Sequence, residues 1–116
     1  MGRLSTHVLD TARGLPAAGV VVRLHRMEGE RAEPVTERLT NADGRTDTPL
    51  LSGTLAPGRY RLTFEAGEYF RRTGVALPDP PFVDAVQLHF GIADPDGHYH
   101  VPLLVSPWAY STYRGS

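Results

Sequence analysis

Apolar and polar residues alternate along three separate stretches of this 116-residue chain, and this period of two limits its fold more than any other feature. In residues 59–65, Tyr60, Leu62 and Phe64 fall on one side, and polar or charged residues fall on the other. Residues 20–25 and 86–92 repeat the pattern. Because successive side chains of a strand point to opposite faces, each stretch predicts a half-buried antiparallel strand.

Turn-forming sequences separate these stretches, at residues 13–16 (RGLP), 41–44 (NADG), 56–58 (APG), 78–81 (PDPP) and 94–97 (DPDG). This spacing predicts an all-β fold, a sandwich of about seven or eight antiparallel strands with Greek-key connections. Residues 66–72 lack the alternation and predict one short helix. With no internal repeat or linker, we expect residues 1–116 to form a single domain.

The composition excludes several classes of function. The chain has no cysteine, so disulfides and thiolate metal sites are excluded, and a net charge of -1 gives no reason to expect nucleic acid as a partner. No apolar run approaches a membrane span, and no signal peptide is recognisable, so we expect a cytoplasmic protein. Lysine is absent, which leaves the five histidines as candidates for acid–base chemistry near neutral pH.

Two of these histidines, His98 and His100, fall on the same face of a strand predicted over residues 98–106. This spacing can present two imidazoles to zinc or copper, and His7, on a strand predicted over residues 4–9, is the candidate for a further ligand. Taken alone, the pair is more typical of exposed polar residues on a strand. His7 alone is likewise more typical of a structural histidine.

The C-terminal tail is unusual, because chain ends normally fray and are small and polar. Residues 109–116 (AYSTYRGS) instead carry two tyrosines and an arginine. We expect this segment to dock and to place polar groups at a buried site or an interface, although an unused, disordered tail remains the alternative. Arg45 follows the turn at residues 41–44 directly, where a solvated charge is the ordinary interpretation.

Four segments together resemble the sequence blocks of the 5-hydroxyisourate hydrolases, in the transthyretin-like protein family. They are residues 4–11 (LSTHVLDT), 40–45 (TNADGR), 98–104 (HYHVPLL), and 106–107 (SP) followed by 110–116 (YSTYRGS). The blocks occur in the family's order and span the chain. The resemblance implies a transthyretin-like sandwich that forms a homotetramer, with active sites at the dimer–dimer interface.

The resemblance also implies a reaction: hydrolysis of 5-hydroxyisourate, a small-molecule substrate, to 2-oxo-4-hydroxy-4-carboxy-5-ureidoimidazoline in urate degradation, with no metal or other cofactor. A histidine would activate water, while an arginine would bind the substrate and share its developing charge. By match to the family's motifs, the catalytic residues are His7, Arg45, His100 and Ser116, the substrate-binding residues are His7, Arg45 and Tyr113, and the supporting residues are His98, Arg114 and Gly115.

Some questions stay open at this level. A non-catalytic transthyretin-like binding protein is the alternative function, although the transthyretins lack the terminal YRGS and the histidine set. A purely structural sandwich is a third, weaker interpretation. The sequence does not say whether His7 or His100 is the general base. Residues 81–84 (PFVD) depart from the family pattern, which leaves the start and edge geometry of the following strand in question.

Overall fold

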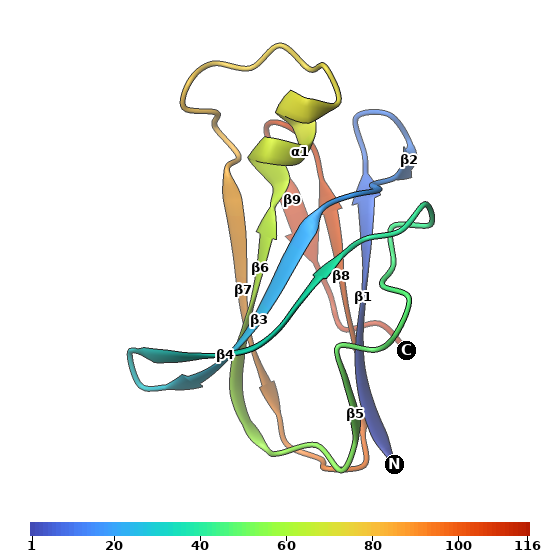
Figure 1. The fold of residues 1–116 in the computed structure, drawn as a ribbon, viewed down its shortest axis with the longest axis vertical. Coiled ribbons are helices and arrows are strands. Elements are labelled where there is room, and N and C mark those ends of the chain that lie inside the picture. The colour runs from blue at the N-terminus through green and yellow to red at the C-terminus, as the bar shows by residue number, and fades with distance from the viewer.

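The computed structural model describes residues 1–116, which form nine strands and one helix (Figure 1). The elements are β1 (Gly2–Asp10), β2 (Leu15–Pro16), β3 (Val21–Glu28), β4 (Arg31–Leu39), β5 (Leu51–Gly53), β6 (Gly58–Glu65), α1 (Ala66–Arg72), β7 (Ala85–Ile92), β8 (His98–Val105) and β9 (Tyr110–Thr112). The short helix occupies the predicted residues. It is not long and apolar enough to cross a membrane.

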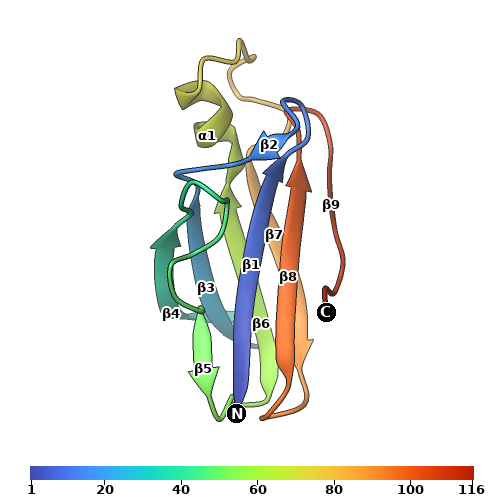
Figure 2. The same cartoon turned by 90° about the vertical axis from the view of Figure 1, so that its right-hand side faces the viewer.

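The strands form two sheets that face each other, as Figure 2 shows. One sheet has the order β2-β1-β8-β9, with β5 also paired to β1, and the other has the order β4-β3-β6-β7. Strands distant in sequence, such as β1 and β8, are neighbours, so the chain crosses between layers, as it does in Greek-key folds. The predicted β-sandwich is confirmed.

Two details differ from the sequence-based expectation. There are nine strands instead of seven or eight, because β2, β5 and β9 are pieces of only two or three residues. In addition, β1 and β8 pair in parallel, whereas the other strand pairs are antiparallel. A tight hairpin forces neighbouring strands to run antiparallel, but β1 and β8 come from opposite ends of the chain and are free of that constraint.

The core lies between the sheets and consists of the apolar side of each alternating stretch. Twenty-two buried apolar residues form one cluster, and Leu62 and Phe64 of β6 are completely buried in it. Burial of each such side chain contributes about 1.5–3 kcal/mol. The polar side of each strand consequently faces away from the core, and any site built on these strands lies on an outer face of the sandwich.

Helix α1 closes one end of the sandwich, where the alternation of β6 stops. Phe70 is fully buried, and the Tyr69 hydroxyl donates a hydrogen bond of 2.9 Å to the buried carboxylate of Asp10, at the end of β1. The Asp10 carboxylate also accepts hydrogen bonds from the backbone N–H groups of Ala12 and Arg13. Helix and sheet are therefore joined where β1 ends.

The unusual segment 81–84 does not disturb the strand that follows it. The Val83 side chain is buried, and its N–H donates to the Pro107 carbonyl at 3.3 Å. The Asp84 carbonyl accepts a hydrogen bond of 3.1 Å from Gly67 in α1. Strand β7 then begins at Ala85 and pairs with β6 along its full length. The departure from the family pattern lies at this end of the sandwich.

Candidate active site

The outer face of the first sheet carries a row of polar side chains from β1 and β8. We call this surface the histidine face, and its members are Arg3, Ser5, His7, His98 and His100. Their neighbours Leu4, Val8, Tyr99 and Val101 point into the core. The parallel register places Arg3 opposite His98 and Ser5 opposite His100. Parallel pairing thus brings polar residues from the two ends of the chain together.

A surface cavity of about 310 Å³ opens on the histidine face. Its lining residues are Arg3, Ser5, Arg45, His98, Tyr99, His100 and Ser116. Four residues predicted from the sequence to belong to one site therefore share one cavity. The lining side chains on the outer face include two arginines, two histidines and two serines. Such a set of donors and acceptors suits a small, planar, oxygen-rich ligand.

Arg45 reaches this cavity because the preceding turn docks on β1. The side-chain oxygen of Asn41 accepts hydrogen bonds from the backbone N–H groups of Asp43 and Arg45, at 2.9 and 3.1 Å. The Gly44 carbonyl accepts a hydrogen bond of 2.8 Å from the Val8 N–H. A Cβ at Gly44, where φ is +74°, would overlap the Val8 carbonyl oxygen. Glycine is therefore required here, both for its conformation and for its close approach to β1.

His7 lies on the same face as the cavity but does not line it. Its Nε2 lies 2.8 Å from the backbone carbonyl oxygen of Asp43, in the turn that carries Arg45. Because a carbonyl only accepts hydrogen bonds, Nε2 must carry a proton. In the neutral ring, Nδ1 is then unprotonated and available as a base. The turn therefore positions Arg45 and sets the tautomer of neutral His7.

His100 is half-buried, with its Nδ1 2.8 Å from the Ser5 hydroxyl oxygen. Burial lowers the pKa of His100 from its usual value of 6.5, and the charges of Arg45 and His7 lower this pKa further. A hydrogen bond with the Ser5 main chain acts in the opposite direction. The net lowering keeps His100 neutral at physiological pH, as a general base requires.

The C-terminal tail packs against His100. The Gly115 N–H donates a hydrogen bond of 2.8 Å to the His100 carbonyl, and the two residues form an isolated β-bridge. A Cβ at Gly115 would overlap His100 Cδ2 and lie 3.1 Å from Cγ. The backbone of the tail is therefore in direct contact with the imidazole ring. Docking of the tail, rather than fraying, agrees with the expectation from its composition.

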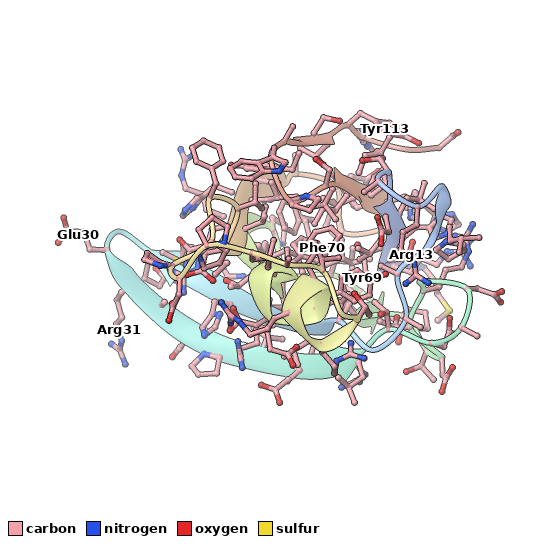
Figure 3. All side chains as sticks on the ribbon, turned by 90° about the horizontal axis from the view of Figure 1, so that it is seen from above. Arg13, Glu30, Arg31, Tyr69, Phe70 and Tyr113 are labelled. Carbon is pink, nitrogen blue, oxygen red and sulfur yellow. The ribbon has the colours of Figure 1, made fainter.

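The other tail residues lie in different places. The Arg114 guanidinium lies 4.4 Å from the centre of the Tyr99 ring and donates to the His98 carbonyl at 3.3 Å. Ser116 lines the 310 Å³ cavity. Tyr113 instead lines a neighbouring cavity of about 340 Å³, with residues of β7 and β8, and its side chain is exposed. Figure 3 shows Tyr113 outside the first sheet. Within one chain, Tyr113 does not reach the residues expected to share its site.

Sequence reasoning assigned no role to Arg3 or Ser5, yet both line the cavity. Ser5 shares the face of His7 by the alternation of β1, and Arg3 follows from the same parity. The alternation of β1, extended from His7 toward the N-terminus, could have indicated that both residues lie on this face. What the sequence lacks is the register of β1 against β8, which places these two residues beside the imidazoles.

His98 and His100 are the only histidine, aspartate or glutamate side chains that line the cavity. No group of three or more histidine, aspartate or glutamate side chains is arranged to hold a metal ion. The third ligand considered for the metal interpretation, His7, instead donates Nε2–H to the Asp43 carbonyl.

Comparison with known proteins agrees with this geometry. Residues 4–115 match the model of the HIUase/Transthyretin family, and the chain belongs to that family. It is 60% identical to the 5-hydroxyisourate hydrolase of Deinococcus radiodurans, over 97% of this chain and 95% of the relative. It is 57% identical to that of Pseudomonas aeruginosa, over 100% of this chain and 93% of the relative.

A solved structure shares the fold as well as the sequence. The 5-hydroxyisourate hydrolase of Klebsiella pneumoniae superposes with a TM-score of 0.83 at 41% identity, and the match covers 100% of both chains. The family resemblance inferred from the four sequence blocks is therefore confirmed, as is the transthyretin-like sandwich.

Proposed function

We propose that this protein hydrolyses 5-hydroxyisourate to 2-oxo-4-hydroxy-4-carboxy-5-ureidoimidazoline, a step in urate degradation. The observation that carries the proposal is the convergence of Arg45, His98, His100 and Ser116 on one cavity, beside His7. The high identity to relatives named 5-hydroxyisourate hydrolase, along the whole chain, supports the same activity.

The reaction adds water to a ring carbonyl and opens the six-membered ring. The water oxygen forms a bond to the carbonyl carbon, one water proton goes to a base, and the carbonyl becomes an oxyanion. The carbon–nitrogen bond then breaks, the departing nitrogen takes up a proton, and a carboxylate is left on the product. The site must therefore supply a base, a stabiliser for the oxyanion and an acid.

The two catalytic histidines present different nitrogens for these proton transfers. Neutral His7 has a free Nδ1, since its Nε2–H is held by the Asp43 carbonyl. His100 has its Nδ1 occupied by Ser5, which leaves Nε2 for the cavity. One imidazole takes the proton from water, and either the other imidazole or the same one returns a proton to the departing nitrogen. Each such transfer contributes about 10²–10⁴ in rate.

Arg45 binds the substrate and shares the charge of the oxyanion. Its planar guanidinium offers several N–H donors in a fixed arrangement that matches paired carbonyl oxygens. No carboxylate forms an ion pair with Arg45, so these donors remain available. Ser116 provides hydrogen bonds from the tail, and His98, Arg114 and Gly115 hold the tail and strand around the cavity.

The assembly that we propose is a homotetramer, built from single domains of residues 1–116, with active sites between dimers. Arg45, His98 and Ser116 are exposed in the isolated chain. A second copy that faced this cavity would exclude water from it and strengthen its electrostatic interactions. In such an assembly Tyr113, remote from the cavity of its own chain, would add to substrate binding. We expect the protein to act in the cytoplasm, without a metal.

A transthyretin-like binding protein is the second candidate, because the family model that matches the chain includes transthyretins. Binding alone gives no reason for a neutral, oriented His100 beside a free guanidinium. The two functions separate in one experiment. A binding protein would retain a small aromatic ligand and leave 5-hydroxyisourate to decay at its spontaneous rate.

The test is the ultraviolet absorbance decay of freshly generated 5-hydroxyisourate, with and without the protein. We expect decay much faster than the spontaneous reaction, unchanged by a metal chelator. Removal of residues 113–116 should cause a loss similar to that of a site substitution, while the thermal unfolding midpoint shows that the sandwich is intact. Decay at the spontaneous rate would refute the proposed activity. Loss of activity with chelator, with stoichiometric zinc or copper in the protein, would instead support the metal interpretation.

A further inference from the structure

Ser5 contacts the candidate base directly, although no step of the reaction uses it. Its hydroxyl oxygen lies 2.8 Å from His100 Nδ1, and the two residues are register partners on adjacent strands. Both side chains are half-buried, and both line the 310 Å³ cavity. The contact is therefore fixed by the pairing of two long strands, not by a mobile loop.

The His100 ring is held along two edges and open along a third. Ser5 occupies Nδ1, and the backbone of Gly115 lies against the Cδ2 edge. Nε2 has no hydrogen-bond partner in the chain, and it is absent from the set of buried unpartnered polar atoms, which are His25 Nδ1, Arg61 Nε and Thr63 Oγ1. Nε2 is thus the ring atom that remains accessible for proton transfer.

We propose that Ser5 is a positioning residue that holds His100 with Nδ1 protonated and Nε2 directed to the cavity as the proton acceptor. The inference rests on the proposed hydrolase function. A serine hydroxyl can donate or accept, and we take Nδ1–H of the neutral ring as the donor and the Ser5 oxygen as the acceptor, the arrangement that leaves a lone pair on Nε2. When Nε2 takes a proton from water, Nδ1–H still donates to Ser5, so the contact persists through the transfer.

A hydroxyl in this place differs from the carboxylate that often orients a catalytic histidine. A carboxylate would stabilise the imidazolium and raise the pKa of His100. Ser5 carries no charge. The charged or titratable residues that line the cavity with His100 are Arg3, Arg45, His98, Tyr99 and, through its α-carboxylate, Ser116, and the charge of His7 also acts on His100. Ser5 therefore orients the ring without adding the negative charge that would keep it protonated.

The test compares Ser5→Ala, Ser5→Thr and a matched control, Ser52→Ala. Ser52 is an exposed residue of β5 whose side chain makes no hydrogen bond. Loss of the hydrogen-bond partner that orients a metal-bound histidine lowers activity about 10- to 100-fold, and we take this as the scale for a partner that orients His100. We expect Ser5→Ala to lower kcat by this factor with a much smaller change in KM. Ser5→Thr, which retains the hydroxyl, should restore most of the activity, and Ser52→Ala should match the parent.

Nitrogen-15 NMR of the histidine rings supplies a readout that does not depend on turnover. We expect the neutral His100 of the parent protein to be protonated mainly at Nδ1, and Ser5→Ala to shift the ring toward protonation at Nε2. Parent-like kcat and an unchanged tautomer in a folded Ser5→Ala protein would overturn the proposal. So would a predominantly Nε2-protonated ring in the parent. If the parent failed to hydrolyse 5-hydroxyisourate, the NMR result would still decide the role of Ser5.

Discussion

The two sheets of this sandwich both present histidines and arginines on their outer faces, yet the residues that we propose as the active site all come from the first sheet and the segments that cover it. The second sheet has a row across β3, β6 and β7 in which His25, Arg61 and His89 are register partners, and we call its outer surface the arginine face. Both faces arise from the same alternation of apolar and polar residues. A period of two therefore cannot tell a functional face from a solvated one.

One difference lies in the charges. On the arginine face, Arg23 forms ion pairs with Glu37 at 2.8 Å and with Glu65 at 2.9 Å. On the histidine face, Arg3 and Arg45 have no carboxylate within ion-pair distance. Their donors remain free for a ligand. On the arginine face, the guanidinium of Arg23 is satisfied within the chain, whereas Arg61 forms no ion pair and its buried Nε has no hydrogen-bond partner.

The other difference lies in what covers each face. The turn at residues 41–45 and the C-terminal tail both reach the histidine face, through the hydrogen bonds from Val8 to Gly44 and from Gly115 to His100. Figure 2 shows the chain ending beside β8, and Figure 3 shows Glu30 and Arg31 far out at the tip of the β3–β4 hairpin of the other sheet. Arg45 from the turn and Ser116 from the tail thus complete the lining of the cavity on the histidine face.

Substitution of single histidines by alanine should give the largest difference in activity between the two faces. His100→Ala should lower kcat/KM for 5-hydroxyisourate by about 10²–10⁴, as loss of a positioned base does. His7→Ala should fall in the same range. His25→Ala, the same change on the arginine face, should leave kcat/KM near that of the parent. Comparable losses for His25→Ala and His100→Ala would show that the faces do not differ in function.

The arginines give the next contrast. Arg45→Ala should lower activity by about 10²–10³, the cost of losing one contact to a developing oxyanion. Arg61→Ala, on the arginine face, is the matched control and should change activity little. The same absorbance assay measures both, with thermal unfolding as the check on folding. Full activity of Arg45→Ala would exclude this residue from substrate binding.

Two glycines test the packing of the tail. Gly115→Ala places a methyl group into the His100 ring, whereas Gly91→Ala on β7 meets no atom nearer than 4.0 Å. A catalytic group displaced by about 1 Å can cost about 10² in rate. We expect that loss for Gly115→Ala and parent-like activity for Gly91→Ala. Equal activity of the two variants would mean that contact of the tail with His100 is not needed.

The smallest expected effect is on pH dependence. Because the pKa of His100 is lowered from 6.5, the ring stays neutral to a more acidic pH than an ordinary histidine does. The acid limb of kcat/KM should therefore lie below pH 6.5. By linkage, this group supports folding above pH 6.5, and its contribution is lost as the pH falls through its folded-state value. An acid limb above pH 6.5 would argue against neutral His100 as the acting base.

Much of this fold was predictable, because the local signals agree with each other. The alternation in β3, β6 and β7 identified the buried faces, and the loss of alternation at residues 66–72 identified α1. The four family-like sequence blocks predicted Arg45, His98, His100 and Ser116 as site residues, and these four residues line one cavity. In these regions the local sequence pattern and the tertiary packing favour the same secondary structure and the same buried side chains.

The remainder depends on contacts between distant segments. The parallel pairing of β1 with β8 leaves no mark on either strand, so the positions of Arg3 and Ser5 beside the imidazoles could not be predicted. Tyr113 was expected at the same site but lies in a neighbouring cavity of the single chain. A sequence shows which face a side chain takes, but the register between strands decides what it meets.

The five histidines, divided between the two faces, allow one direct test of where the substrate binds. The parent protein can be titrated with urate, a stable planar relative of 5-hydroxyisourate, while the assigned imidazole NMR signals are followed. We predict that the signals of His7, His98 and His100 shift with a common affinity, while those of His25 and His89 stay unchanged. Shifts confined to His25 and His89 would contradict the placement of the active site on the histidine face.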